Sequence, residues 1–354
     1  MKARAAADSG QLVAATLKKS WISSPQPELP LDLSQIEAVT PLLYESGAAA
    51  LGWWRLRDTK FSGTSSGELL HQAFRLFALR ARTHEIRIEK LARLFREKNV
   101  EVILIKGWSI ARHYPQQALR PYGDIDLLVR PGDYAAAAKV LSSEELRDCF
   151  TDLHTGPFEL SDRSITDVFS RSQFVPCGDE QVRVLALEDH FALLAIHLLK
   201  HGAWRPLWLC DVGLLVDTMS SEFDWELCLG KDKRRSNWIL SAIGLAGALL
   251  DASINDEQIR ARAHAPAWLI ESVSKNWQAP FAGAHAPQKH RAPIRSYFRR
   301  PRGLLGDLGR RWPDPILSTI SANGTFGHRP RLRYQIHNCV QRAARLALPG
   351  PKHA

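Results

Sequence analysis

The periodicity of apolar residues changes at residue 100, and this change restricts the folds open to the chain. In residues 67–99 apolar side chains recur mostly at three- and four-residue spacing, which predicts a long amphipathic helix. Residues 100–105 (VEVILI) form a short apolar run rich in β-branched side chains, which predicts a buried strand. Residues 124–129 (DIDLLV) begin by alternating acidic with aliphatic residues and predict a second strand. The sequence therefore places a small β-sheet next to a long helix.

Helical patterns lie on both sides of these strands. Residues 34–56 predict one helix or a helix pair, residues 159–169 predict a β-hairpin, and further helices are expected from residue 187 onward. We therefore expect an α+β fold in which a small mixed sheet is flanked by helical segments. The expected divisions are a flexible leader (1–33), an N-terminal helical segment (34–99), an α/β core (100–185), a C-terminal helical domain (186–288) and a basic tail (289–354).

The cysteines and the apolar segments indicate the compartment. The five cysteines include no CxxC pair, which favours reduced thiols over a disulfide framework. The N-terminal residues show no secretory signal, and the longest mostly apolar run, residues 239–250, is too short to span a bilayer. We expect a cytoplasmic protein with no membrane span.

The positive charge is concentrated at the C-terminal end. The formal net charge is +10, with 47 Lys and Arg against 37 Asp and Glu. Residues 289–354 hold 14 of these basic residues and two acids, which leaves 33 basic and 35 acidic residues in 1–288. Such a tail suits contact with RNA phosphates. Without a recognition fold, we favour a basic helical appendage that packs on the core or meets anionic lipid.

The acidic residues of the second strand are the strongest indication of chemistry. Residues two apart on a strand face the same side, so the carboxylates of Asp124 and Asp126 would project together while Ile125 points into the core. Two neighbouring carboxylates repel each other, and a divalent cation offsets that repulsion. A D-x-D triplet also occurs by chance in a chain this acidic. The neighbouring elements therefore have to distinguish a metal site from a chance occurrence.

The turn after the first strand supports a phosphate ligand. Lys106-Gly107-Trp108-Ser109 stands at a strand end and opens a short helix, where free backbone N–H groups favour an anion. Gly107 would let the backbone approach a phosphate closely, and Ser109 could donate its hydroxyl. The alternative is that Gly107 only ends the strand.

Taken together, these segments resemble an uncharacterised bacterial nucleotidyltransferase family of the DNA polymerase β-type superfamily. The family pattern is roughly "ilLKG … R … DiDlLV", and the matching residues here are Ile103 to Gly107, Arg120, and Gly123 to Val129. The resemblance covers about residues 35–280 and continues in Leu187 to Asp189, His197, Lys200, His201 and Leu207 to Asp211.

The resemblance implies a nucleotidyltransferase core and the matching activity. Such a protein would transfer a nucleoside monophosphate from an NTP, with ATP as the expected donor, to a hydroxyl or amine acceptor and release pyrophosphate. Mg²⁺ or Mn²⁺ would be the cofactor, held by Asp124, Asp126 and a third acid from a neighbouring strand. The acceptor remains open among a small molecule, a peptide, a protein and a tRNA, and so does the oligomeric state.

Asp167 is the expected third catalytic and metal-binding acid. It matches the family's "vElHw" or "iDvHw" strand, although this chain has Phe169 and Ser170 where the family usually has His and Trp. Glu159 and Asp152 are the alternatives.

The expected nucleotide-binding residues are Lys106, Gly107, Ser109, Arg120, Lys200 and Asp211. Lys106, Arg120 and Lys200 would neutralise phosphate charge. The alternative for each is an ordinary solvated side chain. Asp211 would touch the ribose or orient a neighbour, and a helix cap or salt bridge explains it as well. His197 and His201 lie one helical turn apart, but residue 198 is Leu, so the H-E-x-x-H chemistry of zinc proteases is absent.

Two other classes of function compete with this hypothesis. The first is a catalytically weak protein of the same fold that binds a nucleotide or a partner. The second is an RNA-binding protein that uses the basic tail. The chain has no P-loop and no G-x-S-x-G elbow, so P-loop kinases and α/β-hydrolases have no motif in their favour.

Overall fold

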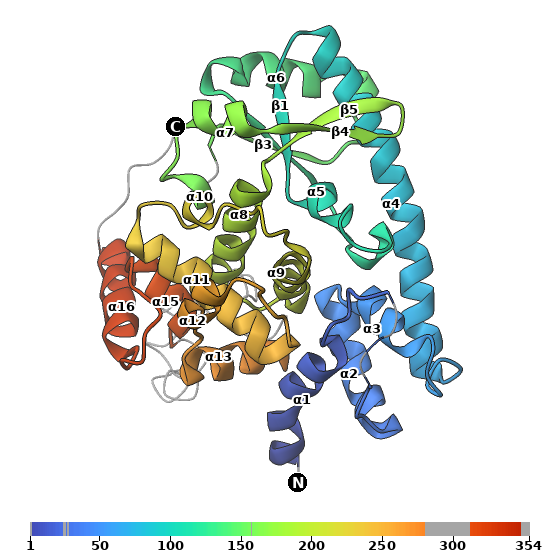
Figure 1. Ribbon diagram of the computed structural model, residues 1–354, viewed down its shortest axis with the longest axis vertical. Coiled ribbons are helices and arrows are strands. Elements are labelled where there is room, and N and C mark those ends of the chain that lie inside the picture. Colours follow the sequence, from blue (N-terminus) through green and yellow to red (C-terminus); the bar gives the residue numbers. More distant parts are fainter. Residues whose placement is uncertain (1, 24–25, 27, 157, 280–311, 348–354) are drawn as a thin grey trace.

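In the computed structural model a mixed sheet lies at one end of the molecule, and helices precede and follow it along the chain (Figure 1). The structure describes residues 2–23, 26, 28–156, 158–279 and 312–347. The sheet has five strands in the order β3-β2-β1-β5-β4. The strands are β1 (Val102–Ile105), β2 (Ile125–Val129), β3 (Thr151–His154), β4 (Gln173–Cys177) and β5 (Glu180–Val184). This architecture confirms the expected α+β fold.

The central strand β1 pairs antiparallel with β2 and parallel with β5. Strand β3 runs parallel to β2, and β4 closes the other edge as an antiparallel hairpin with β5. Between the strands lie α5 (Gly107–Ala111), α6 (Tyr134–Leu141), α7 (Ile165–Arg171) and the short 3₁₀ turns η1 (Gln117–Leu119), η2 (Pro131–Asp133), η3 (Glu144–Leu146) and η4 (Phe158–Leu160).

The helices before the sheet are α1 (Lys2–Leu17), α2 (Leu33–Ser46), α3 (Ala49–Leu56) and α4 (Ser65–Glu97). After the sheet come α8 (Leu187–Lys200), α9 (Pro206–Thr218), α10 (Trp225–Leu229), α11 (Lys233–Leu250), α12 (Glu257–Arg262), α13 (Ala267–Trp277), α15 (Pro315–Ser321) and α16 (Leu332–Ala347). No helix within the described ranges is long and apolar enough to cross a membrane.

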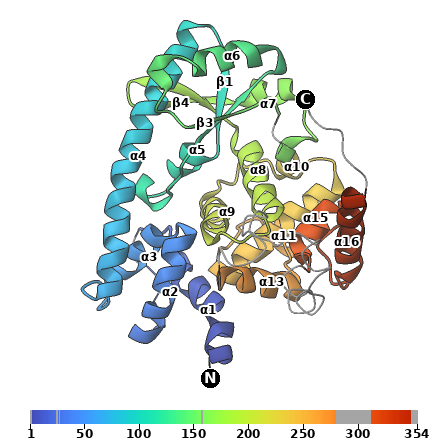
Figure 2. The same ribbon diagram turned by 180° about the vertical axis from the view of Figure 1, so that it is seen from behind.

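Each face of the sheet packs on a different set of helices. Alternate residues of β2 point to opposite faces, so Ile125, Leu127 and Val129 share a core with Phe95 of α4, whereas Leu128 belongs to the core around α8. Helix α4 runs along one side of the molecule from the N-terminal helices to the sheet, and α8 leads from the sheet into the C-terminal helices (Figure 1, Figure 2).

The expected hairpin at residues 159–169 is wrong. This segment forms η4 and the helix α7, and the hairpin of the sheet follows it as β4 and β5. The local cause is Ser164, whose Oγ accepts a hydrogen bond from the backbone N–H of Asp167 at 3.0 Å and thereby caps α7.

The first 33 residues also differ from the expected flexible leader. Lys2–Leu17 forms α1, and Val13 and Leu17 are fully buried. The indole of Trp21 is buried as well and donates a hydrogen bond from Nε1 to Asp217 at 2.9 Å. Apolar residues at positions 13, 17 and 21 therefore attach this segment to the core.

Candidate active site

A polar cavity of about 520 Å³ lies between the sheet and the helices α8 and α9. Its sheet side is formed by the end of β1, the loop before β2, and residues of β2 and β3. Its other side is formed by α8 and the beginning of α9. Of the residues expected from the sequence, six line the cavity: Lys106, Gly107, Arg120, Asp124, Asp126 and Lys200. Both alternative third acids, Asp152 and Glu159, line it too.

Two carboxylates and one imidazole converge on the sheet side of this cavity. The pairing of β2 with β3 sets Asp126 in register with Asp152, so both side chains project from the same face. Nε2 of His154, two residues further along β3, lies 3.2 Å from Asp126 Oδ1 and 3.3 Å from Asp152 Oδ2. One ligand atom from each of the three residues lies within 4.8 Å of the others.

Asp124 is placed differently from Asp126. It lies one residue before β2, is exposed, and lines the same cavity without joining the group of Asp126, Asp152 and His154. Both carboxylates of the D-x-D motif therefore line the same cavity, but only Asp126 belongs to strand β2.

The charges around Asp126 keep its carboxyl ionised. Burial would raise the pKa of Asp126, but a hydrogen bond from His154 and the nearby ammonium of Lys106 outweigh that effect and lower it. Lys106 Nζ is 2.9 Å from Asp126 Oδ1. The hydrogen bond with Asp126 raises the pKa of His154, although burial opposes it. The ionised carboxylate is the form that binds a cation.

The turn after β1 has an unusual backbone conformation. Lys106 has φ of 56° and Gly107 has φ of 39°, both in the region that L-residues with side chains rarely occupy. A Cβ atom at Gly107 would lie 3.3 Å from the Tyr122 ring and 3.5 Å from the Asp124 carbonyl oxygen. The turn is thus held close to the loop that carries Asp124, and it directs Lys106 toward Asp126.

The helical side of the cavity carries a second polar group around Glu159. His197 Nδ1 lies 3.3 Å and Lys200 Nζ 3.5 Å from Glu159 Oε1. Burial would raise the pKa of Glu159, but the hydrogen bond from His197, the backbone and the charge of Lys200 lower it to about 2. Trp208 packs edge-on against His197, with ring centroids 4.9 Å apart. This side therefore offers a fixed negative charge, cations and aromatic surface.

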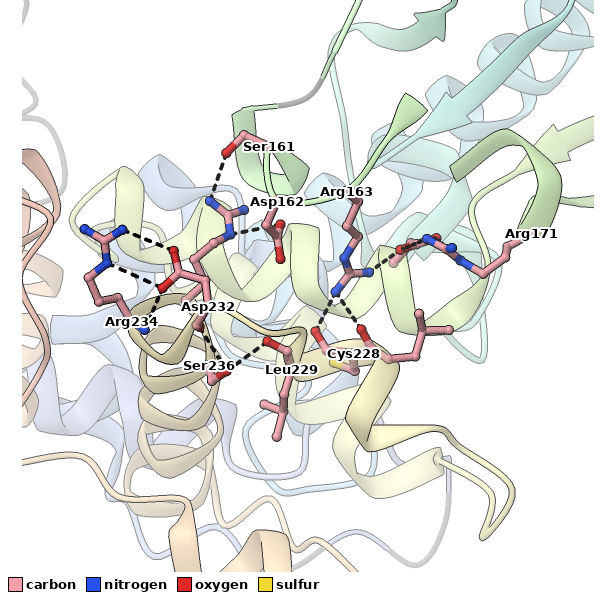
Figure 3. A network of polar contacts seen from close by, with 12 residues as sticks. Ser161, Asp162, Arg163, Arg171, Cys228, Leu229, Asp232, Arg234 and Ser236 are labelled. Carbon is pink, nitrogen blue, oxygen red and sulfur yellow. Dashed lines mark hydrogen bonds and ion pairs between the residues drawn. The ribbon is translucent and has the colours of Figure 1, made fainter. Parts of the chain in front are cut away.

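A buried ion-pair network holds the segment that carries Glu159. Asp189 of α8 is fully buried and accepts hydrogen bonds from Arg163 and Arg171. Arg163 also donates to the carbonyl oxygens of Leu227 at 3.0 Å and Cys228 at 2.6 Å (Figure 3). Figure 3 shows the two arginines approaching from the η4–α7 segment toward α8 and α10. The loop with Glu159 is therefore tied to the helices.

Three of the expected site residues have other surroundings. Asp167 is exposed on α7 and does not line the cavity, because the segment is a helix and not a strand of the sheet. Ser109 is buried and donates its hydroxyl to the carbonyl oxygen of Leu104 at 2.7 Å. Asp211 is fully buried and accepts a bidentate hydrogen bond from Arg120, with Nη2 to Oδ2 at 2.8 Å, and another from Tyr114 at 2.9 Å.

His154 was missed by the sequence analysis, and Asp152 was only an alternative there. The family pattern "iDvHw" nevertheless fits Thr151-Asp152-Leu153-His154, which supplies an acid together with the histidine that is missing after Asp167. The histidine two residues after the acid was the available signal, because side chains two apart on a strand share a face.

The three side chains fit a divalent cation. Ligands at neighbouring positions of an octahedron with metal–ligand distances of about 2.1 Å are about 3.0 Å apart. The separations of His154 Nε2 from the two carboxylate oxygens, 3.2 and 3.3 Å, are close to this edge length. Carboxylates suit Mg²⁺ and Mn²⁺, and an imidazole ligand favours transition cations over Mg²⁺.

Comparison with known proteins gave one match. A family model described as "Uncharacterised nucleotidyltransferase" matches residues 32–249, which is more than half of the chain. The matched segment runs from the N-cap of α2 into the last turn of α11, so it includes the whole sheet and the cavity. No curated protein and no solved structure matches the chain. The match confirms the resemblance that the motifs had indicated.

Proposed function

Because the chain belongs to this family of uncharacterised nucleotidyltransferases, we propose that it transfers a nucleoside monophosphate from an NTP, with ATP as the expected donor. The acceptor is a hydroxyl or amine group, and pyrophosphate is released. The observation that carries the proposal is the convergence of Asp126, Asp152 and His154 beside the Lys106–Gly107 turn in one cavity.

Asp126 and Asp152, with His154, form the proposed site for Mg²⁺ or Mn²⁺. Asp152 replaces Asp167 as the third acid, and Asp124 remains at the exposed part of the same cavity. When bound, the cation supplies positive charge to the triphosphate oxygens and lowers the pKa of the acceptor.

The side chains of the cavity have distinct roles in this proposal. Lys106, whose Nζ lies 2.9 Å from Asp126 Oδ1, would supply its ammonium charge to the triphosphate. Lys200 supplies charge from the helical side. The acceptor atom attacks the α-phosphorus, the bond to the β-phosphate oxygen breaks, and pyrophosphate leaves. The side chain of Asp152 is 61% exposed, so an acceptor can approach it, and Asp152 would take the acceptor's proton.

We assign positioning roles, and not direct contacts with the phosphates, to Ser109, Arg120 and Asp211. Ser109 fixes the turn through Leu104, and Arg120 is held by Asp211 beneath the loop that carries Asp124. A nucleotide can therefore meet Arg120 only at the edge that lines the cavity.

The position of a radioactive label tests the reaction type. The purified protein is incubated with cell extract, Mg²⁺ or Mn²⁺, and ATP labelled at either the α- or the γ-phosphate. Nucleotidyl transfer predicts acceptor labelling from α-labelled ATP alone, whereas phosphoryl transfer would label the acceptor from the γ-position. Asp126→Asn and Asp152→Asn are each expected to lower the transfer by roughly 100-fold or more.

Asp167→Asn is the matched control, because Asp167 is exposed and lies outside the cavity. It is expected to retain activity within about twofold. Transfer that survives Asp126→Asn, or that fails with Asp167→Asn alone, would refute the assignment. Metal-dependent binding of NTP without any transfer would identify a nucleotide-binding protein instead.

A further inference from the structure

The last helix, α16, presents an apolar row to solvent. Leu332, Ile336 and Val340 are spaced four residues apart and therefore follow one face of the helix. Their exposed fractions are 53%, 47% and 61%. A single exposed apolar side chain is ordinary, but three in a row on one helix form a continuous strip.

The opposite side of α16 attaches to the protein through polar and aromatic groups. Gln335 donates from Nε2 to the carbonyl oxygen of Pro313 at 2.8 Å. The ring of Tyr334 packs so closely on Gly324 that a Cβ atom there would lie 2.6 Å from it. The helix thus packs on α15 with its more polar side and turns its apolar side outward, the reverse of an ordinary surface helix.

Basic residues border the apolar row. Arg333 follows Leu332 directly, Arg342 follows Val340 by two residues, and both are exposed. A helical turn of 100° per residue sets them on opposite edges of the strip. Residues 315–354 contain no Asp or Glu. An apolar strip with basic edges and no acid is the pattern of a helix that lies in the plane of an anionic membrane surface.

The positive charge beside the apolar strip distinguishes between the surfaces that could cover it. The segment 280–311 holds eight Lys and Arg against one acid, so like charges oppose its docking on α16. A second copy of α16 meets the same repulsion. RNA would satisfy the arginines but leave the apolar row in water. An anionic lipid surface satisfies both.

We propose that α16 binds the protein peripherally to anionic membranes, with Leu332, Ile336 and Val340 inserted below the headgroups and Arg333 and Arg342 at the level of the lipid phosphates. This function is separate from the nucleotidyltransferase site, because none of the described side chains of α16 lines the cavity.

Vesicle sedimentation with the full chain tests the proposal. The protein is mixed with sucrose-loaded vesicles of phosphatidylcholine alone or of phosphatidylglycerol with phosphatidylcholine, and the pelleted fraction is measured at low and high salt. The wild type is expected to bind the anionic vesicles about tenfold more tightly and to lose part of this binding at high salt. The triple variant Leu332→Gln, Ile336→Gln, Val340→Gln is expected to lose about tenfold in affinity.

The control is a triple variant at exposed apolar residues of α4, Leu76→Gln, Leu79→Gln and Ile86→Gln, whose exposed fractions are 41%, 70% and 52%. It should bind anionic vesicles as the wild type does. Circular dichroism and thermal unfolding establish that both variants fold. Wild-type protein that ignores anionic vesicles would overturn the proposal. Full binding of anionic vesicles by the α16 variant would also overturn it, because the basic segments alone would then account for the binding. The same conclusion holds if added RNA abolishes the binding that this variant retains.

Discussion

At the scale of single residues, a buried histidine makes stability depend on pH. His190 of α8 is 2% exposed, and its Nε2 has no hydrogen-bond partner among the residues that the structure describes. Burial, reinforced by the charges of His113, Arg112 and Arg120, lowers the pKa of His190 to about 3. The folded protein therefore keeps this side chain neutral far below the pH at which an unfolded histidine takes up a proton.

The sign of the effect follows from proton binding. Between pH 6.5, the ordinary pKa of histidine, and about pH 3, the unfolded chain binds one proton more at residue 190 than the folded chain does. Acid therefore favours unfolding in this window, by about 1.4 kcal/mol per pH unit. His190→Leu should reduce the loss of unfolding free energy between pH 7 and pH 5 by about 2 kcal/mol, as measured by urea unfolding.

His328→Leu is the control for this prediction, because residue 328 is exposed. Its stability should follow the wild-type pH dependence. Identical pH dependence in the wild type and His190→Leu would contradict the predicted role of residue 190.

The sequence predicted part of the candidate site for reasons that are visible residue by residue. Asp126 and the Lys106–Gly107 turn stand on buried apolar strands, whose patterns are strong. Strand β3 has four residues that are exposed or half-buried, so its pattern is weak and Asp152 was only an alternative. Its partner in the sheet is β2, and pairing between distant segments leaves no local sequence signal.

At the scale of elements, the network around Asp189 joins η4 and α7 to the helices beside them. The carboxylate of Asp189 is fully buried and accepts hydrogen bonds from Arg163 and Arg171. Asp189→Ala leaves both guanidinium groups without this partner. We expect a loss of about 3–5 kcal/mol in unfolding free energy, measured by urea unfolding at neutral pH.

Arg234→Ala is the matched control for the network. The Arg234–Asp232 pair is a surface ion pair, with the arginine side chain 53% exposed. Its removal should cost less than about 1 kcal/mol. If Asp189→Ala were as mild as Arg234→Ala, the loop that carries Glu159 would have to be held by its apolar contacts instead.

Helices were easier to predict than the segments between them. The long helix expected at 67–99 is α4 at Ser65–Glu97, because its apolar spacing is regular and its N-cap Thr64 satisfies the backbone. The hairpin predicted at 159–169 is wrong because the apolar residues Ile165 and Val168 belong to a short helix, which Ser164 caps. An N-cap residue fixes where a helix begins, and here it favours a helix over the strand that so short an apolar pattern suggests.

At the scale of the whole molecule, the first helix closes the chain onto the C-terminal helices. A Cβ atom at Gly10 of α1 would lie 1.9 Å from the carbonyl oxygen of Ser274 in α13. Gly10→Ala should therefore push the two helices apart and destabilise the protein by about 1–3 kcal/mol, although alanine favours an isolated helix. Thermal unfolding measures this difference.

Gly63→Ala provides the comparison, because a Cβ atom at Gly63 would meet no atom of the described part of the chain within 4 Å. Its unfolding midpoint should equal or slightly exceed that of the wild type. Equal midpoints for the wild type and Gly10→Ala would show that α1 does not pack on α13 as described.

The buried pair of Arg120 and Asp211 also joins the segment before β2 to α9. Arg120 stands four residues before Asp124, and Asp211 lies within α9 on the other side of the cavity. Sliding α9 away from the strand would leave two opposite charges stranded in the interior, at a cost of several kcal/mol. The gap between sheet and helices is therefore fixed when the chain folds. We therefore expect the cavity to keep the same width when a ligand binds.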